Sequence, residues 1–380
     1  MDRSYRVVIL FGVLSFLGDV IYEGSRSILG QYLYILGASS LAIGIIFGLG
    51  ELINFILRSI AGYLADRTNS YWLMLGVGYG LLICISLITF VNVWYFAGLL
   101  FLFERLGKAI RTPARDVLLA RVSKGIGLGK TFGIHKFIDQ FGAILGPIIV
   151  SYIILVGSYK QAFFFMIIPY LLVLLVIFLI KRLYHYEIGF HMEKGGDVVF
   201  KKGVVYFLLS IFFAGMGCVS FGIMGFHWKA SSVFSDAIIP IIYSFGMLIS
   251  GFFSLLLGVL FDRLGIKIIL IGILVSIFYP FLTFSNSWFL IIFGVFLWAI
   301  GLGVNESTFK LGLARLYGVS GQTFGIFYSL YGLGVFLGGV FMGYFYQFSI
   351  YFVVIFSVLC QFISFCIFWA LYRFSSRSTL

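Results

Sequence analysis

A six-residue phrase occurs twice in this chain, as GYLADR at residues 62–67 and as GVLFDR at residues 258–263. At each place a long apolar run ends at the phrase and another begins within a few residues, which indicates two equivalent tight turns. A second phrase, TFGI, also occurs twice, at residues 131–134 and 323–326. Because nearly the same offset holds through a further element, we interpret the chain as two repeats, each covering most of one half.

The composition indicates a lipid environment. Of the 380 residues, 62% are hydrophobic, only 11% are charged and 46 are Phe, which is more apolar surface than a water-soluble domain could hide. Each bilayer crossing takes about 20 apolar residues as a helix, because backbone polar groups must be satisfied within the segment. We therefore predict an all-α polytopic membrane protein with twelve transmembrane helices. The predicted spans are residues 6–36, 40–64, 70–91, 93–115, 129–156, 158–181, 203–230, 236–260, 266–285, 288–312, 321–346 and 348–373.

The distribution of Lys and Arg predicts the orientation. If the N-terminus is cytoplasmic, most of the 26 basic residues fall in the cytoplasmic connections, while the outside holds only Lys160 and Lys229. We expect a multi-pass protein of a prokaryotic cell membrane with both termini in the cytoplasm. The net charge of +12 then reflects membrane topology, and no nucleic-acid partner is needed to explain it.

The longest polar stretch divides the chain. We predict an N-terminal six-helix bundle at residues 1–182, a cytoplasmic linker at residues 183–202 and a C-terminal six-helix bundle at residues 203–380. The first apolar segment carries charges and lacks a small-residue cleavage site, so we expect it to remain as the first helix. The four Cys residues fall within predicted spans without paired spacing, which favours packing over metal or disulfide roles.

Charged residues inside the predicted spans are the main functional signal, because each costs about 2.5–3.5 kcal/mol at the bilayer centre. In the first span Asp19, Glu23 and Arg26 fall on one helical face at 100° per residue. Fixed ion pairs such as Glu104 with Lys108 are the alternative to a functional role. The predicted proton-coupling and substrate residues are Asp19, Glu23, Arg26, Glu51, Glu104, Arg105, Lys108, His135, Asp139, Asn305 and Glu306.

Among these residues, Asp19 is the first candidate for a proton carrier, followed by Asp139 beside His135. A buried carboxylate whose cationic partner moves away favours its protonated form, so it can load and release a proton as access alternates. The second half contributes an aromatic set, which favours an amphipathic or aromatic substrate. Ordinary packing is the alternative, since 20% of all residues are aromatic. The predicted aromatic cavity consists of Phe221, Trp228, Tyr243, Trp298, Tyr328 and Tyr331.

The twelve spans in two sets of six, with G-x-x-x-D-R after span two and G-x-x-x-D-R-x-G-x-K after span eight, resemble the major facilitator superfamily. The resemblance implies two pseudo-symmetric bundles that alternate access. It also implies a cytoplasmic gating motif formed by Gly62, Asp66, Arg67, Gly258, Asp262, Arg263, Gly265 and Lys267. In the first copy, residues 68–70 (TNS) replace the usual Gly and basic residues, so we expect Asp262 to act more strongly than Asp66.

The residue types in the gating motif suggest the contacts that each of them makes. Gly permits close helix approach, and Asp66 is placed to meet the positive N-terminal end of a neighbouring helix. Span five also resembles the antiporter signature of the superfamily, through Gly133, Gly142, Gly146 and Pro147, with Val150 where a Gly is usual. Close helix packing explains these small residues equally well.

The sequence thus predicts a secondary active transporter, with proton-coupled efflux of an amphipathic or aromatic compound as the main hypothesis. Proton-coupled or facilitative uptake of a small metabolite is the alternative, and an intramembrane enzyme or a non-transporting sensor is less expected. There is no G-x-x-x-x-G-K-[ST] loop for ATP, so we expect no cofactor and a proton gradient as the energy source. The expected partners are a small-molecule substrate, protons and the lipid bilayer, and we expect a monomer.

Overall fold

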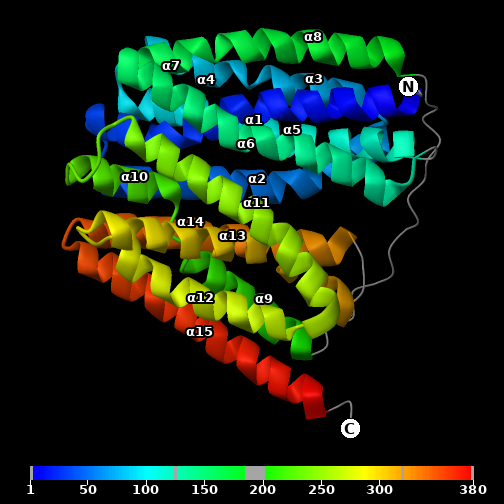
Figure 1. Cartoon of the computed structure of the whole chain (residues 1–380). Coiled ribbons are helices and arrows are strands. Elements are labelled where there is room, and N and C mark those ends of the chain that lie inside the picture. The colour runs from blue at the N-terminus through cyan, green and yellow to red at the C-terminus, as the bar shows by residue number, and fades with distance from the viewer. Residues whose placement is uncertain (1–2, 124–125, 185–201, 318–320, 378–380) are drawn as a thin grey trace. The chain divides into compact units, whose positions relative to one another are not determined.

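The computed structural model describes residues 3–123, 126–184, 202–317 and 321–377 (Figure 1). Within these ranges the chain is helical throughout, and the connections are short. The helices are α1 (Arg3–Ile35), α2 (Ser40–Thr68), α3 (Tyr71–Gly80), α4 (Ile83–Leu87), η1 (Ile88–Phe90), α5 (Trp94–Val122), α6 (Leu128–Val156), α7 (Tyr159–Phe165), α8 (Ile167–Leu183), α9 (Lys202–Met216), α10 (Phe221–Ala230), α11 (Ile238–Leu264), α12 (Lys267–Thr283), α13 (Trp288–Tyr317), α14 (Gly321–Tyr346) and α15 (Ile350–Arg377).

The predicted all-helical fold is confirmed, because each of the twelve predicted spans coincides with one helix or with a run of consecutive helices. In the described part of the chain, ten such segments are long and apolar enough to cross a membrane. The other two are α5, whose 29 residues carry many charges, and α12, which has 17 residues.

Three predicted spans are broken helices rather than continuous ones, namely α3–α4–η1, α7–α8 and α9–α10. At the α9–α10 break, the Gly217 carbonyl accepts hydrogen bonds from Ser357 Oγ at 2.6 Å and Tyr279 Oη at 3.3 Å. The Val219 amide donates to the same Tyr279 hydroxyl at 2.8 Å. Side chains therefore satisfy backbone groups that the break releases, as a low-dielectric interior requires.

The described helices form two compact units. Unit 1 contains α1, the second part of α2 from Ile56, helices α3 to α8, and the start of α11 up to Ser244. Unit 2 contains the first part of α2, helices α9 and α10, the rest of α11 from Phe245, and helices α12 to α15. Most of the predicted linker lies outside the described residues, so the division at residues 182 and 203 stays a prediction.

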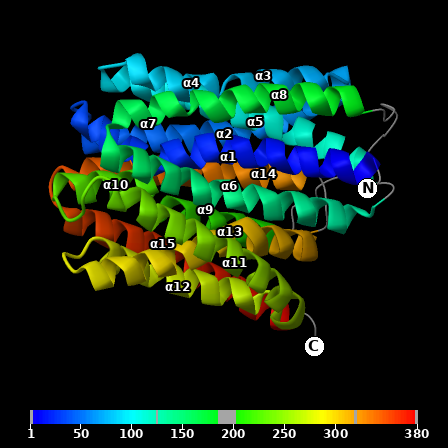
Figure 2. The same cartoon turned by 45° about the horizontal axis from the view of Figure 1, so that its top comes forward.

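Within unit 1, α1 lies along α6 in both views (Figures 1 and 2). Glycine makes this contact close. A Cβ atom on Gly146 would stand 2.6 Å from the Val20 carbonyl oxygen, and one on Gly24 would stand 3.2 Å from the Gly146 oxygen. Gly142 faces the Phe16 carbonyl in the same way. Two of the antiporter-like glycines thus serve backbone-to-backbone packing, which was the alternative interpretation of that signature.

Gly146→Ala should lower the stability of the protein by about 1–3 kcal/mol, because the added methyl group must push α1 away from α6. Thermal melting of the purified protein in detergent measures the effect. Gly133→Ala is the matched control, since a Cβ there meets nothing within 4 Å and Ala is the better helix former. Equal melting temperatures for the two variants would contradict the close contact.

Unit 2 has a core of its own. Phe207 and Ile211 of α9, Ile269 of α12 and Leu313 of α13 are fully buried within one hydrophobic cluster. Helices α9 and α15 are also joined by a hydrogen bond, in which Ser210 Oγ donates to the Ser364 carbonyl at 2.9 Å. Apolar burial with satisfied hydroxyl groups is the usual solution for helix packing in lipid.

Candidate functional site

The charged residues of unit 1 gather where α1, α5 and α6 meet. Helical spacing explains which side chains share a face. Asp19, Glu23 and Arg26 recur at intervals of four and three along α1, and His135 and Asp139 are four apart on α6. The α1–α6 glycine contact then brings the two sets together.

Glu104 is held by two arginines. Arg105 approaches its Oε2 atom with Nε at 2.9 Å and Nη2 at 2.6 Å, and Arg111 Nη2 lies 3.1 Å from Oε1. Both Glu104 and Arg105 have no exposed side-chain surface. The predicted ion pair of Glu104 with Lys108 is therefore replaced, because Arg105 and Arg111 supply the hydrogen bonds to both carboxylate oxygens. Such a double pairing is typical of a structural ion pair.

Tyr22 of α1 is a site residue that the sequence reasoning missed. Its hydroxyl accepts hydrogen bonds from Arg105 Nη1 and from Arg26 Nη1, the latter at 2.6 Å. Its ring carries the Lys108 ammonium and the Arg105 guanidinium, each 3.5 Å from the ring centroid. The i,i+4 spacing of Tyr22 and Arg26 was a readable signal, whereas the approach of α5 was not.

Glu23 connects this cationic group to α11. Its Oε2 atom accepts a hydrogen bond from Tyr243 Oη at 2.5 Å, and its Oε1 atom lies 4.0 Å from Lys108 Nζ. The prediction placed Tyr243 with the aromatic cavity of the second half. In the structure Tyr243 belongs to unit 1 and bonds a carboxylate, because the start of α11 lies with unit 1.

Asp19 and Asp139 form a carboxyl pair across the α1–α6 contact. Their side chains lie within hydrogen-bonding reach of each other. Lys136 Nζ stands 3.2 Å from Asp139 Oδ2, and the Lys136 side chain is 53% exposed. Two carboxyl groups this close repel each other when both are ionised, and one proton held between them removes the repulsion.

His135 lies one turn from Asp139 and has hydrogen-bond contacts of its own. Its Nε2 atom is 2.8 Å from Ser15 Oγ, which also receives a hydrogen bond from Arg115 Nη1 at 3.1 Å. Arg115 in turn pairs with Asp116 at 2.9 Å. The two predicted α6 residues therefore face different partners, although they share one helical face.

The remaining predicted polar residues lie in unit 2. Glu51 is half-buried on the part of α2 that belongs to unit 2. Asn305 Nδ2 donates to Tyr331 Oη at 3.0 Å. The Phe55 ring stacks on Tyr328 at 5.6 Å and meets Tyr331 edge-on at 5.4 Å. The side chain of Glu306 lies outside the described residues.

Three of the predicted cavity aromatics pack against one another, and Trp298 also lines the small cavity described below. Phe221 packs against Trp228 and Trp298 with ring centroids 5.6 and 5.8 Å apart, and all three are buried. The indole nitrogen of Trp228 donates to the Thr283 carbonyl at 2.9 Å, and that of Trp298 to the Val219 carbonyl at 3.2 Å. Indole groups satisfied by backbone carbonyls are typical of core tryptophans.

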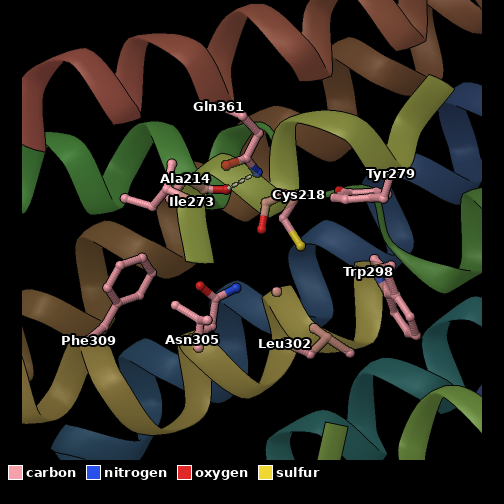
Figure 3. A pocket seen from close by; sticks show the side chains of 12 residues that line it. Ala214, Cys218, Ile273, Tyr279, Trp298, Leu302, Asn305, Phe309 and Gln361 are labelled. Atoms are coloured by element: carbon pink, nitrogen blue, oxygen red, sulfur yellow. Dashed lines mark hydrogen bonds between the residues drawn. The ribbon is translucent and has the colours of Figure 1, made fainter. Parts of the chain in front are cut away.

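A small cavity lies beside the α9–α10 break in unit 2 (Figure 3). Figure 3 shows Asn305 below it and Gln361 above it, with the Cys218 thiol pointing inward. Gln361 Nε2 donates to the Ala214 carbonyl at 3.1 Å. The cavity measures about 10 Å³, which is room for roughly one water molecule and too small for a substrate.

The two copies of the gating motif keep the same turn geometry. Asn69 has φ of 52° after the first copy, and Gly265 has φ of 60° at the matching place after the second. Asn is the non-glycine residue that tolerates this left-handed conformation best, so the departure at residues 68–70 preserves the turn. Arg67, Asp262, Arg263 and Lys267 are exposed.

One expectation about the gating motif is corrected. A Cβ on Gly258 would meet nothing within 4 Å, and one on Gly62 would meet only Pro113 at an ordinary 3.5 Å, so neither glycine serves a close helix approach here. Asp66 contacts the first residue of α3, because Tyr71 Oη donates to its Oδ1 atom at 2.9 Å.

Tyr71→Phe and Asp66→Asn should each weaken the same contact. A hydrogen bond to a carboxylate contributes about 1–2 kcal/mol. Either change should therefore shift the equilibrium between the outward-open and inward-open states roughly tenfold. The labelling rate of a cysteine placed on the cavity wall, measured from the cytoplasmic side, reports the shift. Tyr63→Phe is the matched control, since Tyr63 is exposed. If both variants are labelled at the wild-type rate, the hydrogen bond between Tyr71 and Asp66 only stabilises the turn and has no role in gating.

Comparison with known proteins agrees with this architecture. The sequence model described as Major Facilitator Superfamily matches residues 8–339. An uncharacterized protein of Mycobacterium tuberculosis (strain ATCC 25618 / H37Rv) is 29% identical over 360 residues, covering 91% of this chain and 88% of its own length. Among solved structures, the nucleoside transporter NupG superposes with a TM-score of 0.74 at 16% identity, covering 98% of this chain and 99% of its own.

A transporter of the POT family, solved in complex with 5-aminolevulinic acid, gives a TM-score of 0.77 at 15% identity, covering 99% of this chain and 97% of its own. Identities this low establish the fold alone. The match to the family model covers most of the chain and confirms the resemblance seen in the sequence. This chain therefore belongs to the Major Facilitator Superfamily and is a multi-pass membrane transporter rather than an enzyme.

Proposed function

We propose that this protein is a proton-coupled secondary transporter in which the Asp19–Asp139 carboxyl pair carries the proton. The observation that carries the proposal is the approach of two carboxyl groups from different helices inside the bundle. Glu104 is a poor candidate for the same role, because two arginines already neutralise it. His135 has Ser15 as its hydrogen-bond partner, with Nε2 at 2.8 Å from Oγ.

In this proposal, movement of the Lys136 side chain controls when the carboxyl pair binds a proton. Its ammonium lies 3.2 Å from Asp139, yet its side chain is the most exposed of the charged groups around the pair. Contact of Lys136 with Asp139 favours release of the proton from the pair, since the cation offsets the repulsion between the carboxyl groups. When Lys136 turns toward water, the pair takes up a proton. Alternating access then exposes the pair to one side of the membrane at a time.

For the direction of transport we propose efflux of an amphipathic or aromatic compound, with both termini in the cytoplasm. Efflux is suggested by the resemblance of residues 133–147 to the antiporter signature, although Gly142 and Gly146 of that signature also pack against α1. The ring cluster of Phe55, Tyr328 and Tyr331 beside Asn305 supports an aromatic substrate. Uptake is the second candidate. It is favoured by the ligands that the similar structures name, a nucleoside and 5-aminolevulinic acid, which are small polar molecules.

Purified protein in proteoliposomes that contain a pH-sensitive dye tests the proposal. Compounds are added one at a time, and a transported compound should change the internal pH. The sign of the change distinguishes exchange from co-transport. Asp236→Asn is the control, because Asp236 lies in the connection between α10 and α11, outside the charged group, and it should behave as wild type. Transport of a compound with no proton movement, under an imposed gradient of either sign, would contradict proton coupling.

A further inference from the structure

Helices α1 and α6 run in the same direction where they pack together in unit 1. A Cβ atom on Gly12 would stand 2.6 Å from the Ile138 side chain, and one on Gly146 would stand 2.6 Å from the Val20 carbonyl oxygen. Residue numbers therefore rise together along the two helices. A pairing of side chains between them can recur one turn earlier on both.

Ser15 and His135 form such a recurrence. They lie one turn before Asp19 and Asp139 on the same two helices, and His135 Nε2 is 2.8 Å from Ser15 Oγ. Four residues of helix rise about 6 Å, so this contact directly precedes the carboxyl pair along the helices. In the predicted orientation α1 and α6 both begin in the cytoplasm, which puts His135 on the cytoplasmic side of the pair.

The polar contacts of His135 continue to water. Ser15 Oγ receives a hydrogen bond from Arg115 Nη1 at 3.1 Å, and Arg115 Nη2 donates to Asp116 Oδ1 at 2.9 Å. His135 is buried, whereas the Asp116 side chain is 42% exposed. A chain of side chains thus joins a buried imidazole, one turn from the carboxyl pair, to a carboxylate in contact with solvent.

Titratable and charged groups lie around His135 on four helices. They are Asp19 on α1, Tyr79 on α3, Arg115 and Asp116 on α5, and Lys136 and Asp139 on α6. The Asp139 carboxylate attracts a charged imidazole, and the Arg115 guanidinium repels it. These opposed charges favour an imidazole that exchanges a proton over one that keeps it.

The chemistry of the side chains selects His135 among the buried members of this network. An imidazole can accept a proton at one ring nitrogen and release one from the other. Ser15 supports both states, because its hydroxyl can donate to Nε2 of the neutral ring and accept from Nε2–H of the charged ring. Arg115 has donors only and stays protonated, so it cannot pass a proton on.

We propose that His135 transfers protons between the Asp19–Asp139 pair and water at the Asp116 end of this network. The neutral imidazole accepts one proton from water and becomes an imidazolium. The imidazolium gives one proton to Asp139, directly or through a water molecule, and is neutral again. Cβ atoms four residues apart on a helix are about 5–6 Å apart, which allows either route. The inference rests on the proposed function, since the proton that is transferred is the one that the pair carries.

A sudden release of protons from a photolabile acid tests the transfer in the full-length protein in detergent, without knowledge of the substrate. Infrared spectroscopy follows the carboxylic C=O band of the pair as it takes up a proton. His135→Gln can keep a hydrogen bond to Ser15 but cannot titrate. It should slow the appearance of the band by roughly tenfold or more and leave the final amplitude unchanged. His227→Gln makes the same change at a buried histidine of unit 2 and should leave the rate unchanged.

His135→Ala distinguishes proton transfer from a structural role. It removes the ring, so imidazole added to the buffer should restore most of the lost rate in this variant and have no effect on His135→Gln. Slowing that imidazole does not relieve would make the role of His135 structural and would overturn the transfer.

The same experiment separates this inference from the proposed function. A band that appears in His135→Gln at the wild-type rate would overturn the route through His135, while the titrating band itself would still support the carboxyl pair as the proton carrier. A wild-type protein without the band would contradict the proposed function and the route together.

Discussion

Asp19→Asn should reduce gradient-driven transport to the level of empty liposomes, while the purified protein still folds and melts close to wild type. The amide has nearly the shape of the carboxyl group, so packing along α6 is kept and the free energy of unfolding should change by less than about 1 kcal/mol. The amide cannot take up or release a proton, so the pair with Asp139 loses its function. Transport assays and thermal melting measure the two outcomes.

Asp139→Asn should have the same effect on transport, because the proton is held between the two carboxyl groups and both are needed to bind it. Asp236→Asn makes the same chemical change outside the charged group and should leave transport intact. If Asp19→Asn and Asp139→Asn both transport at the wild-type rate with an unchanged pH dependence, the two carboxylates have a structural role only.

Glu104→Gln should have the opposite profile, with a large loss of stability. Glu104 faces Arg105 and Arg111 in a fully buried setting. Replacing the carboxylate with an amide leaves two guanidinium groups without their counter-charge, and removing one partner of a buried ion pair costs about 3–5 kcal/mol. We expect a poor yield of folded protein and a strongly lowered melting temperature in detergent.

Asp19→Asn is the matched control for Glu104→Gln, since both convert an intramembrane carboxyl group to an amide. The contrast between them separates a structural acid from one that binds a proton. If Glu104→Gln melts like wild type and instead loses transport, then Glu104 takes part in coupling and the assignment of roles is wrong.

The sequence predicted the helices well, because hydrophobic length and charge distribution specify membrane spans directly. It also selected the acids that the structure gathers, since intramembrane charge is rare and costly. The breaks at α3–α4, α7–α8 and α9–α10 were missed. At the α9–α10 break, side chains from distant helices satisfy the backbone, and these contacts cannot be read from local sequence. Ser357 and Tyr279 at the α9–α10 break are examples.

The pairing of the site residues could not be predicted from one sequence. Spacing on α5 favoured Lys108 as the partner of Glu104, whereas the fold gives it Arg105 and Arg111. Which side chains meet across helices depends on the rotation and depth of each helix, and glycine contacts such as that at Gly146 determine both here. Tyr22 shows the same limit, because its spacing from Arg26 on α1 does not reveal that Arg105 and Lys108 of α5 approach its ring.

Infrared difference spectroscopy of the wild-type protein across a pH titration tests the shared proton most directly, and it requires no knowledge of the substrate. We predict a carboxylic C=O band that disappears as the pH is raised, and that is lost when Asp19→Asn and Asp139→Asn are combined while Asp236→Asn leaves it unchanged. A wild-type protein without such a titrating band, or one whose band persists in the double variant, would contradict the assignment of the proton to this pair.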